Sequence, residues 1–200
     1  MILAIDTSAA IAVAVVGDGG DVLARRAEYA PRGHAELLSV FVREALAEAG
    51  VERASRIVVG TGPAPFTGLR VGLVTARTLA YAWGVPLDGV CSLDAIGAAR
   101  GGEVTVVADA RRKEVYWASY RDGVRIVGPA VDAPAEVQVV GDVVGRGALL
   151  YPDAFPGAVD GDPDPAALVA VADQLRAAGV TELSTEPLYL RRPDVHGVPA

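Results

Sequence analysis

The sequence has little of what disulfides and zinc sites require. It contains one cysteine, Cys91, and two histidines, His34 and His196. A single cysteine cannot form an internal disulfide, and these three residues do not have the spacing of a zinc site. We therefore expect a cytoplasmic protein that holds no metal of its own.

Positive charge is scarce as well. The 200 residues include 18 lysines and arginines against 25 aspartates and glutamates, which gives a net charge of -7. Such a surface is unsuited to neutralising phosphates over a long footprint. We expect any nucleic acid to be handled mainly by a partner.

Long uncharged hydrophobic runs are missing. No stretch reaches the roughly 18 apolar residues that a membrane helix needs. The first residues are apolar, but no basic segment precedes them and Asp6 interrupts the run, unlike in a signal peptide. With 52% hydrophobic residues the chain has ample core material, and its length suits one domain or two small ones. We expect a soluble protein.

The most informative stretch that is present runs from Gly60 to Gly84, with the sequence GTGPAPFTGLRVGLVTARTLAYAWG. A glycine- and proline-rich turn follows the apolar residues 57–59, and apolar side chains then recur at helical spacing. This order predicts a strand, a tight turn and a helix that has Thr67 as its N-cap and ends at Gly84.

A turn of this kind can hold an anion, because the amides at a helix N-terminus are free. The sequence has no phosphate-binding loop and no dinucleotide fingerprint. Pro63 and Pro65 also lack the amide hydrogens that a phosphate would bind. A structural turn and a ligand contact are both open interpretations.

The rest of the first hundred residues has the pattern of an α/β protein. β-branched residues and turn signals predict an antiparallel meander, and short apolar runs predict buried parallel strands. Ser92 can cap a helix that runs through Ala99. We expect strands at residues 2–6, 11–16, 22–29, 56–59 and 86–90, and helices at residues 35–49 and 67–83.

The same pattern returns roughly a hundred residues later. The stretch VTVVAD, which ends at Asp109, resembles ILAID, which ends at Asp6. We expect further strands at residues 104–109, 114–120, 125–131 and 137–142, a surface loop at residues 141–165 and a helix at residues 165–178.

This repetition predicts two similar α/β halves that pack together. We place them at residues 1–102 and 103–200, with the second half reduced. The arrangement is similar in topology to the actin-like and sugar kinase folds, a likeness that guides function only weakly.

Three stretches resemble the TsaB family of YeaZ-like, glycoprotease-like proteins: ILAIDTS, GTGPAPFTGLRVG and DARRKEVYWASY. RGHAELL and EPLYLR match shorter signatures of the family in the same order, so the resemblance covers essentially the whole chain. FTGLR is its most specific part. One departure is Ala64-Pro65, where members of the family usually have Gly-Ser. It weakens the expectation that amides of this turn bind a ligand.

The resemblance implies a fold of two actin-like, ribonuclease H-like halves and a role without catalysis. TsaB proteins are paralogues of TsaD, the catalytic subunit that carries metal-binding histidines and transfers a threonylcarbamoyl group to adenosine in tRNA. The implied partners are a TsaD-like catalytic subunit, met through a helical interface, and a TsaE-like ATPase. Members of the family tend to form homodimers when alone. Contact with tRNA would be indirect, and no catalytic residue is expected.

Asp6 and Thr7 lie where actin-like enzymes hold a metal-bound nucleotide phosphate, and Asp109 is the counterpart in the second half. Two interpretations are open. The three residues can form a degenerate nucleotide site, with ATP or ADP at an interface shared with a partner. Alternatively, the fold retains them for its own geometry, since an aspartate can accept amide bonds from the turn that follows it.

The helix at residues 67–83 is apolar or small nearly all round, which indicates burial on more than one face. One side should pack on the sheet, and the other is available to a second chain unless the second half covers it. Arg70 lies in the first turn, where a cation is mildly unfavourable. Two interpretations are open: a partner, an inter-subunit carboxylate or a bound anion meets it, or it is an exposed arginine that costs only about a few tenths of a kcal/mol. His34 has no nucleophile beside it in the sequence and fits a cap or an interface better than a base. The predicted interface residues are His34, Leu37, Leu38, Phe41, Leu69, Arg70, Val71, Val74, Thr75 and Thr78.

Two functions from different classes follow. The first is a scaffold subunit that docks on TsaD and activates it. The second is an ATP-dependent enzyme that acts alone through Asp6 and Asp109. Binding or hydrolysis of ATP by the purified chain separates the two. A protease would need a metal or a nucleophile with its base, and these residues supply neither.

Overall fold

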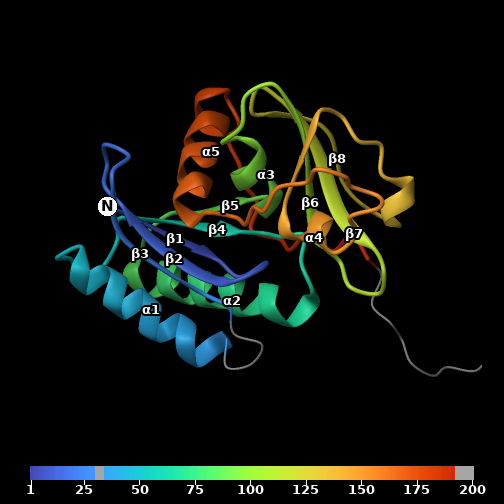
Figure 1. The fold of residues 1–200 in the computed structure, drawn as a ribbon. Coiled ribbons are helices and arrows are strands. Elements are labelled where there is room, and N and C mark those ends of the chain that lie inside the picture. Colours follow the sequence, from blue (N-terminus) through green and yellow to red (C-terminus); the bar gives the residue numbers. More distant parts are fainter. Residues whose placement is uncertain (30–33, 192–200) are drawn as a thin grey trace, which may run out of the picture.

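The computed structural model describes residues 1–29 and 34–191, apart from the side chains of residues 34 and 35. The chain forms an α/β fold with two mixed sheets, as expected, and the sheets lie next to each other (Figure 1). Within the described residues, no helix is long and apolar enough to cross a membrane.

The first sheet consists of β1 (Ile2–Asp6), β2 (Ile11–Val16), β3 (Val22–Glu28), β4 (Arg56–Gly60) and β5 (Leu87–Val90). Their order across the sheet is β3-β2-β1-β4-β5. The first three strands form the expected antiparallel meander, and β4 and β5 run parallel to β1.

Helices cover both faces of this sheet. α1 (His34–Glu48) and α2 (Phe66–Trp83) lie side by side on one face, and α5 (Pro165–Ala177) covers the other (Figure 1). Because side chains alternate along a strand, Leu3 and Ile5 enter the core beneath α1 and α2, while Ala4 packs toward α5. All residues of β1 and β2 are buried for this reason.

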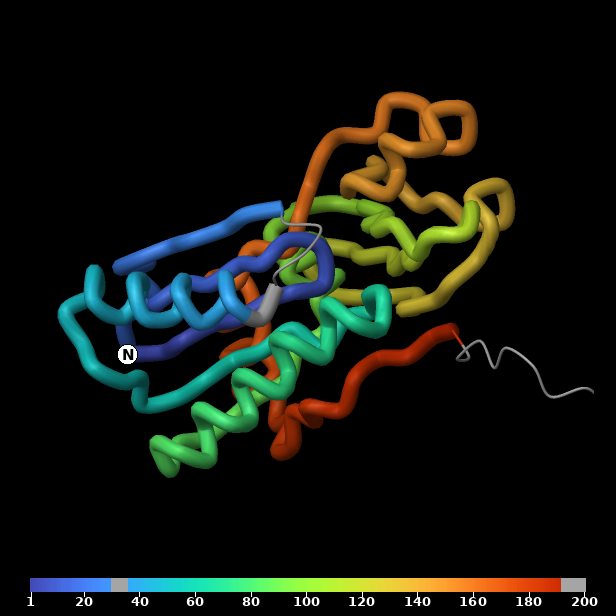
Figure 2. Tube along the Cα trace, turned by 90° about the horizontal axis from the view of Figure 1, so that it is seen from below, coloured from blue at the N-terminus to red at the C-terminus, as the bar shows by residue number. Residues whose placement is uncertain are grey.

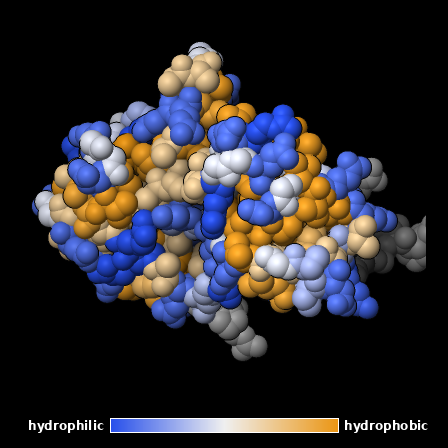
Figure 3. All heavy atoms as spheres, turned by 45° about the horizontal axis from the view of Figure 1, so that its top comes forward, coloured by the Kyte–Doolittle hydropathy of each residue, from blue (hydrophilic) through white to orange (hydrophobic). Residues whose placement is uncertain are grey.

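The second sheet is smaller. It consists of β6 (Glu103–Asp109), β7 (Val115–Arg121), β8 (Val124–Asp132) and β9 (Asp142–Val144), in the order β8-β7-β6-β9. As in the first sheet, an antiparallel meander is followed by a strand parallel to its first strand. This shared order agrees with two similar halves, while their origin by duplication and the division at residue 102 stay predictions. Figure 3 shows hydrophobic residues gathered on the side of this sheet, where β8 exposes Val124, Ile126 and Val127.

Two predicted helix caps are wrong. α2 begins at Phe66, and the residue before it is Pro65, so Thr67 lies inside the first turn. Ser92 is the first residue of α3 (Ser92–Gly97), and its hydroxyl donates to Asp6 and does not cap the helix. This helix ends before Ala99. The end of α2 is as predicted, because Gly84 takes the left-handed conformation with φ of 65°.

The segment before α5 also differs from expectation. The expected strand at residues 137–142 is displaced to β9, because the backbone of Val140 bonds to the side-chain hydroxyl of Thr105 in β6 and not to the backbone of that strand. Residues 141–165 are not simply a surface loop, since they include β9, the short α4 (Arg146–Leu149) and the buried Phe155. A Cβ atom at Gly147 would lie 2.3 Å from the carbonyl carbon of Ala108. Glycine is therefore needed for α4 to pack directly on β6.

After α5, residues 181–191 return across the molecule without regular structure, and we call them the C-terminal strap. Figure 2 shows the strap, in red, running beside α2 toward the second sheet. Backbone bonds fix it to the first half, where Leu183 accepts from Gly89 and Leu188 donates to Thr61, both at 2.9 Å. Leu188 and Leu190, two of the three residues of its apolar LYL stretch, pack on the core of the second sheet.

Candidate functional site

The carboxylate at the end of β1 is enclosed by protein donors. Asp6 is 2% exposed. Its Oδ1 accepts from the amide and hydroxyl of Ser8, at 2.8 and 2.6 Å, and its Oδ2 accepts from the Ser92 hydroxyl at 2.6 Å. Burial raises the pKa of Asp6, and the hydrogen bonds from Ser8 and Ser92 partly oppose this effect.

These bonds fasten the glycine-rich turn to the sheet. The Ser92 hydroxyl also accepts from the Gly62 amide at 3.2 Å. A Cβ atom at Gly60 would lie 1.9 Å from Oδ2 of Asp6, so only glycine permits this close approach. The turn is therefore held in place by the end of β1.

Thr7 has a similar role for α2. Its hydroxyl donates to the carbonyl of Gly68 at 2.9 Å and accepts from the amide of Gly72 at 3.2 Å. Asp6 thus holds the turn through the Ser92 hydroxyl, and Thr7 bonds directly to the first turns of α2. This arrangement is the one expected if the fold retains both residues for its own geometry; a nucleotide at these residues stays a prediction.

A cavity of about 310 Å³ lies between the two halves. Apolar side chains, among them Leu93 and Ile96, form part of its wall. Asp109 lines the cavity, but Asp6 lies behind Ser8 and does not. The structure therefore does not bring the two predicted aspartates together on the cavity wall. The polar residues that line it are Ser8, Tyr29, Asp109, Arg111, Arg146 and Asp162.

Each arginine of the cavity has an acidic partner. Arg111 pairs with Asp109 at 3.2 Å, and Arg146 pairs with Asp162 at 3.5 Å while lying 3.8 Å from the centre of the Tyr29 ring. Burial and the nearby Asp6 raise the pKa of Asp162. In the part of the chain that the structure describes, no cluster of three or more acidic, histidine or cysteine residues could hold a metal.

The loop between β6 and β7 is strained and braced. Three consecutive residues, Arg111, Arg112 and Lys113, have φ between 55° and 62°, a conformation that costs about 1–2 kcal/mol per non-glycine residue. Arg191 of the C-terminal strap donates to the carbonyls of Ala110 and Arg111, at 2.9 and 3.3 Å. The sequence identified Arg191 only as part of a family signature.

The outer face of α2 is exposed and largely apolar. Val74 is 61% exposed, and Val71 and Thr75 are half-buried beside it. A shallow groove of about 480 Å³ runs along this face. Its walls are Phe66, Thr67, Arg70, Val71, Val74 and Thr75.

The predicted interface set divides in two. Arg70, Val71, Val74, Thr75 and Thr78 face outward on α2, and Leu37 is half-buried on α1. Three members are wrong as surface contacts because they belong to the core between the helices and the sheet. These are Leu38, Phe41 and Leu69. The side chain of His34 lies outside the described residues.

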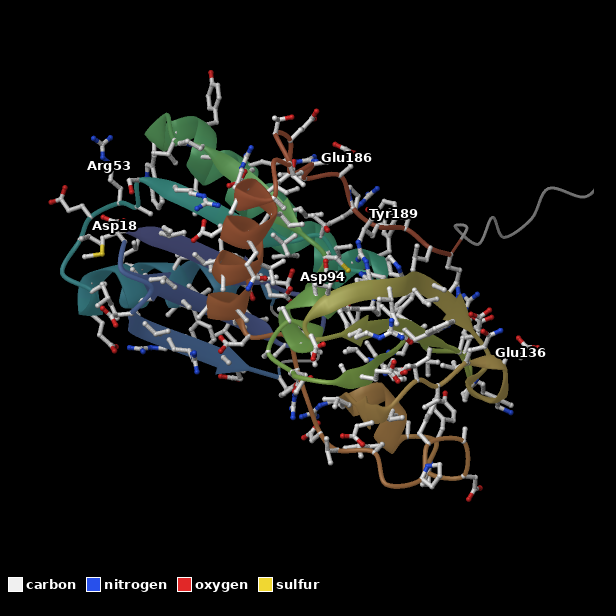
Figure 4. The ribbon with its side chains drawn as sticks, turned by 90° about the horizontal axis from the view of Figure 1, so that it is seen from above. Asp18, Arg53, Asp94, Glu136, Glu186 and Tyr189 are labelled. Carbon is white, nitrogen blue, oxygen red and sulfur yellow. The ribbon has the colours of Figure 1, made fainter. Side chains whose placement is uncertain are left out.

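The strap adds a cluster that sequence reasoning missed. Tyr189 stacks on Phe66 with ring centres 5.2 Å apart. The Arg70 guanidinium lies 3.6 Å from the centre of the Phe66 ring, and its Nε donates to the Tyr189 hydroxyl at 2.8 Å. Figure 4 shows Tyr189 and Glu186 on the strap beside α2. We call Phe66, Arg70 and Tyr189 the α2 aromatic cluster.

Comparison with known proteins places this geometry in a family. The family model described as "TsaD: tRNA N6-adenosine threonylcarbamoyltransferase" matches residues 26–148. An uncharacterized protein of Mycobacterium leprae is 44% identical over 208 residues; the match covers 100% of this chain, which spans 57% of that protein's length. Among solved structures, YeaZ from Pseudomonas aeruginosa has a TM-score of 0.81 at 30% identity, covering 94% of this chain and 99% of that one.

The tRNA threonylcarbamoyladenosine biosynthesis protein TsaB of Escherichia coli (strain K12) is similar over nearly the whole length. The two are 33% identical over 219 residues, which covers 95% of this chain and 94% of the relative. By this match, and by its agreement with the YeaZ structure, the chain belongs to the TsaB family.

Proposed function

We propose that this protein is a non-catalytic subunit of the machinery that makes threonylcarbamoyladenosine in tRNA, and that it docks on a TsaD-like catalytic subunit and activates it. The relatives named TsaB support the pathway. The match to the TsaD family model supports kinship with the catalytic subunit, and the two sheets are taken as the halves of an actin-like fold.

The apolar outer face of α2 is the observation that carries the docking role. Exposed apolar patches bordered by polar residues mark interaction sites in soluble proteins. The core side of α2 is already filled by Leu69, Leu73 and Ala76. Val71 packs on this core in part, but Val74 is 61% exposed and is no member of it. The same face would serve self-association when the chain is alone.

The further partners follow from the family resemblance and from charge. A TsaE-like ATPase completes the complex, which we place in the cytoplasm. The net charge of -7 favours a partner as the main contact for tRNA.

The protein needs no cofactor of its own under this proposal, and ATP or ADP would bind only at an interface shared with a partner. Two observations support this: Asp6 is occupied by Ser8 and Ser92, and the cavity arginines are paired. The alternative is an ATP-dependent enzyme that acts alone, and the cavity beside Asp109 is what favours it. Calorimetry of the isolated chain with Mg²⁺ and ATP at millimolar concentration tests it. Binding that Asp109→Asn abolishes would overturn the scaffold proposal.

Light scattering on the chain with an equal amount of its TsaD tests docking. Val74→Arg places a charge on the outer face of α2, and we expect the one-to-one complex of the wild type to be lost. Val124→Arg is the matched control, because Val124 is 67% exposed on β8 and far from α2. Equal complex formation by wild type and Val74→Arg would show that α2 does not carry the interface.

A further inference from the structure

Arg70 is the one feature of the α2 groove that apolar docking does not explain. Within residues 1–29 and 34–191, no carboxylate pairs with it, although Arg77 two turns later pairs with Glu186 at 2.8 Å. A guanidinium has five N–H donors. The structure uses Nε for the Tyr189 hydroxyl, so the two terminal nitrogens of Arg70 have no acceptor among the described residues.

The α2 aromatic cluster fixes the position of this cation. Phe66 supports one face of the guanidinium at 3.6 Å, and the Tyr189 hydroxyl holds Nε at 2.8 Å. Tyr189 is itself held, because Leu188 and Leu190 on either side of it pack on the second sheet and Arg77 binds the strap at Thr185. A long side chain that is already ordered loses less entropy when it binds a ligand.

We propose that Arg70, positioned by Tyr189, is a receptor for a carboxylate carried by a helix of the catalytic subunit. This inference rests on the docking function proposed above. With Nε occupied, the two terminal nitrogens remain for an end-on, two-bond contact, which a planar carboxylate fits. Val71 and Val74 line the same groove as the cation, so a partner helix packed on them would exclude water from the contact.

Charge favours a different chain over a second copy as the occupant, since Glu36 is the one glutamate of α1 that a second copy could offer. α2 contains two arginines and no acidic residue, so the pairing of α2 with α2 of another copy leaves Arg70 without a counter-charge. Two of the glutamates of α1, Glu44 and Glu48, already pair with Arg26. A nucleic acid fits less well, because a phosphate backbone needs several cations in a row and this groove has one.

The test measures the affinity of the full chain for its TsaD by calorimetry. We expect Arg70→Gln to weaken the complex about tenfold, which corresponds to about 1.4 kcal/mol, and to reduce its salt dependence. Tyr189→Phe keeps the ring and removes the hydroxyl, and we expect a loss of about threefold in the wild type. In the Arg70→Gln background it should have no effect, since Tyr189 acts through Arg70. Arg70→Lys keeps the charge but lacks the planar pair of terminal nitrogens. Its affinity for TsaD should lie between those of the wild type and Arg70→Gln.

Arg53→Gln is the control for net charge. Arg53 is exposed and lies at the end of the molecule opposite Tyr189 (Figure 4). If Arg70→Gln and Arg53→Gln bind TsaD with equal affinity while Val74→Arg does not bind it, Arg70 is not a receptor for a carboxylate. The docking function would still stand. Wild type that does not bind TsaD would overturn both.

Self-association measured on the same variants decides the occupant. Arg70→Gln should leave self-association unchanged. If it weakens self-association as much as it weakens the TsaD complex, or if it weakens only binding to tRNA, the assignment to a carboxylate of the catalytic subunit is wrong.

Discussion

Replacement of Gly60 by alanine should damage the junction on which α2 rests. The added Cβ atom would lie 1.9 Å from Oδ2 of Asp6 and 2.7 Å from the hydroxyl oxygen of Ser92. These two atoms form a 2.6 Å hydrogen bond that cannot survive between them. Overpacking in a core costs about 1–3 kcal/mol, and loss of a bond to a buried charged group costs about 1.5–3 kcal/mol.

We expect Gly60→Ala to lower the free energy of unfolding by about 3 kcal/mol, since the structure relaxes part of the clash. For a chain of this size that corresponds to a fall in Tm of about 6–12 °C. Ser92→Ala removes the bond without the clash and should cost about half as much. Urea unfolding followed by circular dichroism measures all three proteins.

Gly101→Ala is the matched control, because a Cβ atom there meets no atom within 4 Å. We expect its stability to lie within about 0.5 kcal/mol of the wild type. If Gly60→Ala unfolds at the same urea concentration as Gly101→Ala, the contact between Gly60, Asp6 and Ser92 does not bear on stability, and the account of the junction is wrong.

Two further predictions concern buried carboxylates. Because burial raises the pKa of Asp6, the folded protein keeps this proton to a higher pH than the unfolded chain; the stability it contributes is full below about pH 4 and is lost as pH rises through the folded value. The wild type should therefore lose stability relative to Asp6→Asn in urea unfolding as pH rises above about 4, and parallel pH profiles would contradict this. Asp88 is 2% exposed and binds both Arg56 and Arg176, so Asp88→Asn should cost about 3 kcal/mol. Asp173→Asn, which removes an exposed partner of the same Arg56, should cost less than about 1 kcal/mol in the same assay, and similar losses for the two variants would contradict the buried cluster.

The elements that depend on local pattern were predictable from the sequence. Both three-strand meanders, α1 and α2 and the left-handed end of α2 at Gly84 follow from alternation, helical spacing and glycine. The position of β9 was not predictable. VQVV, which precedes it, has a strand-like pattern, and only the contact with Thr105 decides where pairing with β6 begins. Local propensity is overridden in such cases by tertiary contacts.

The candidate surface was predictable only in part, for a geometric reason. α2 is apolar nearly all round, so its spacing does not tell which of Leu69 and Val74 faces the sheet. Tyr189 lies 119 positions from Arg70, and Arg191 lies 81 and 80 positions from Ala110 and Arg111. No periodicity connects segments so distant. The prediction that Arg70 meets a carboxylate or an anion from a partner stays a prediction, because the bond from its Nε goes to the Tyr189 hydroxyl of the same chain.

The docking helix is braced from two directions, and this links the junction at Asp6 to the proposed interface. On one side, Asp6 fixes the turn before α2 and Thr7 fixes its first turns. On the other side, the strap holds the same end of the helix through Tyr189 and Phe66. Polar groups at the end of β1 that could have faced a ligand are instead bonded within the protein, Asp6 to Ser8 and Ser92 and Thr7 to α2. A surface held in one position loses little entropy on binding, so the residue types that resemble a nucleotide site contribute to this chain as supports for a docking face.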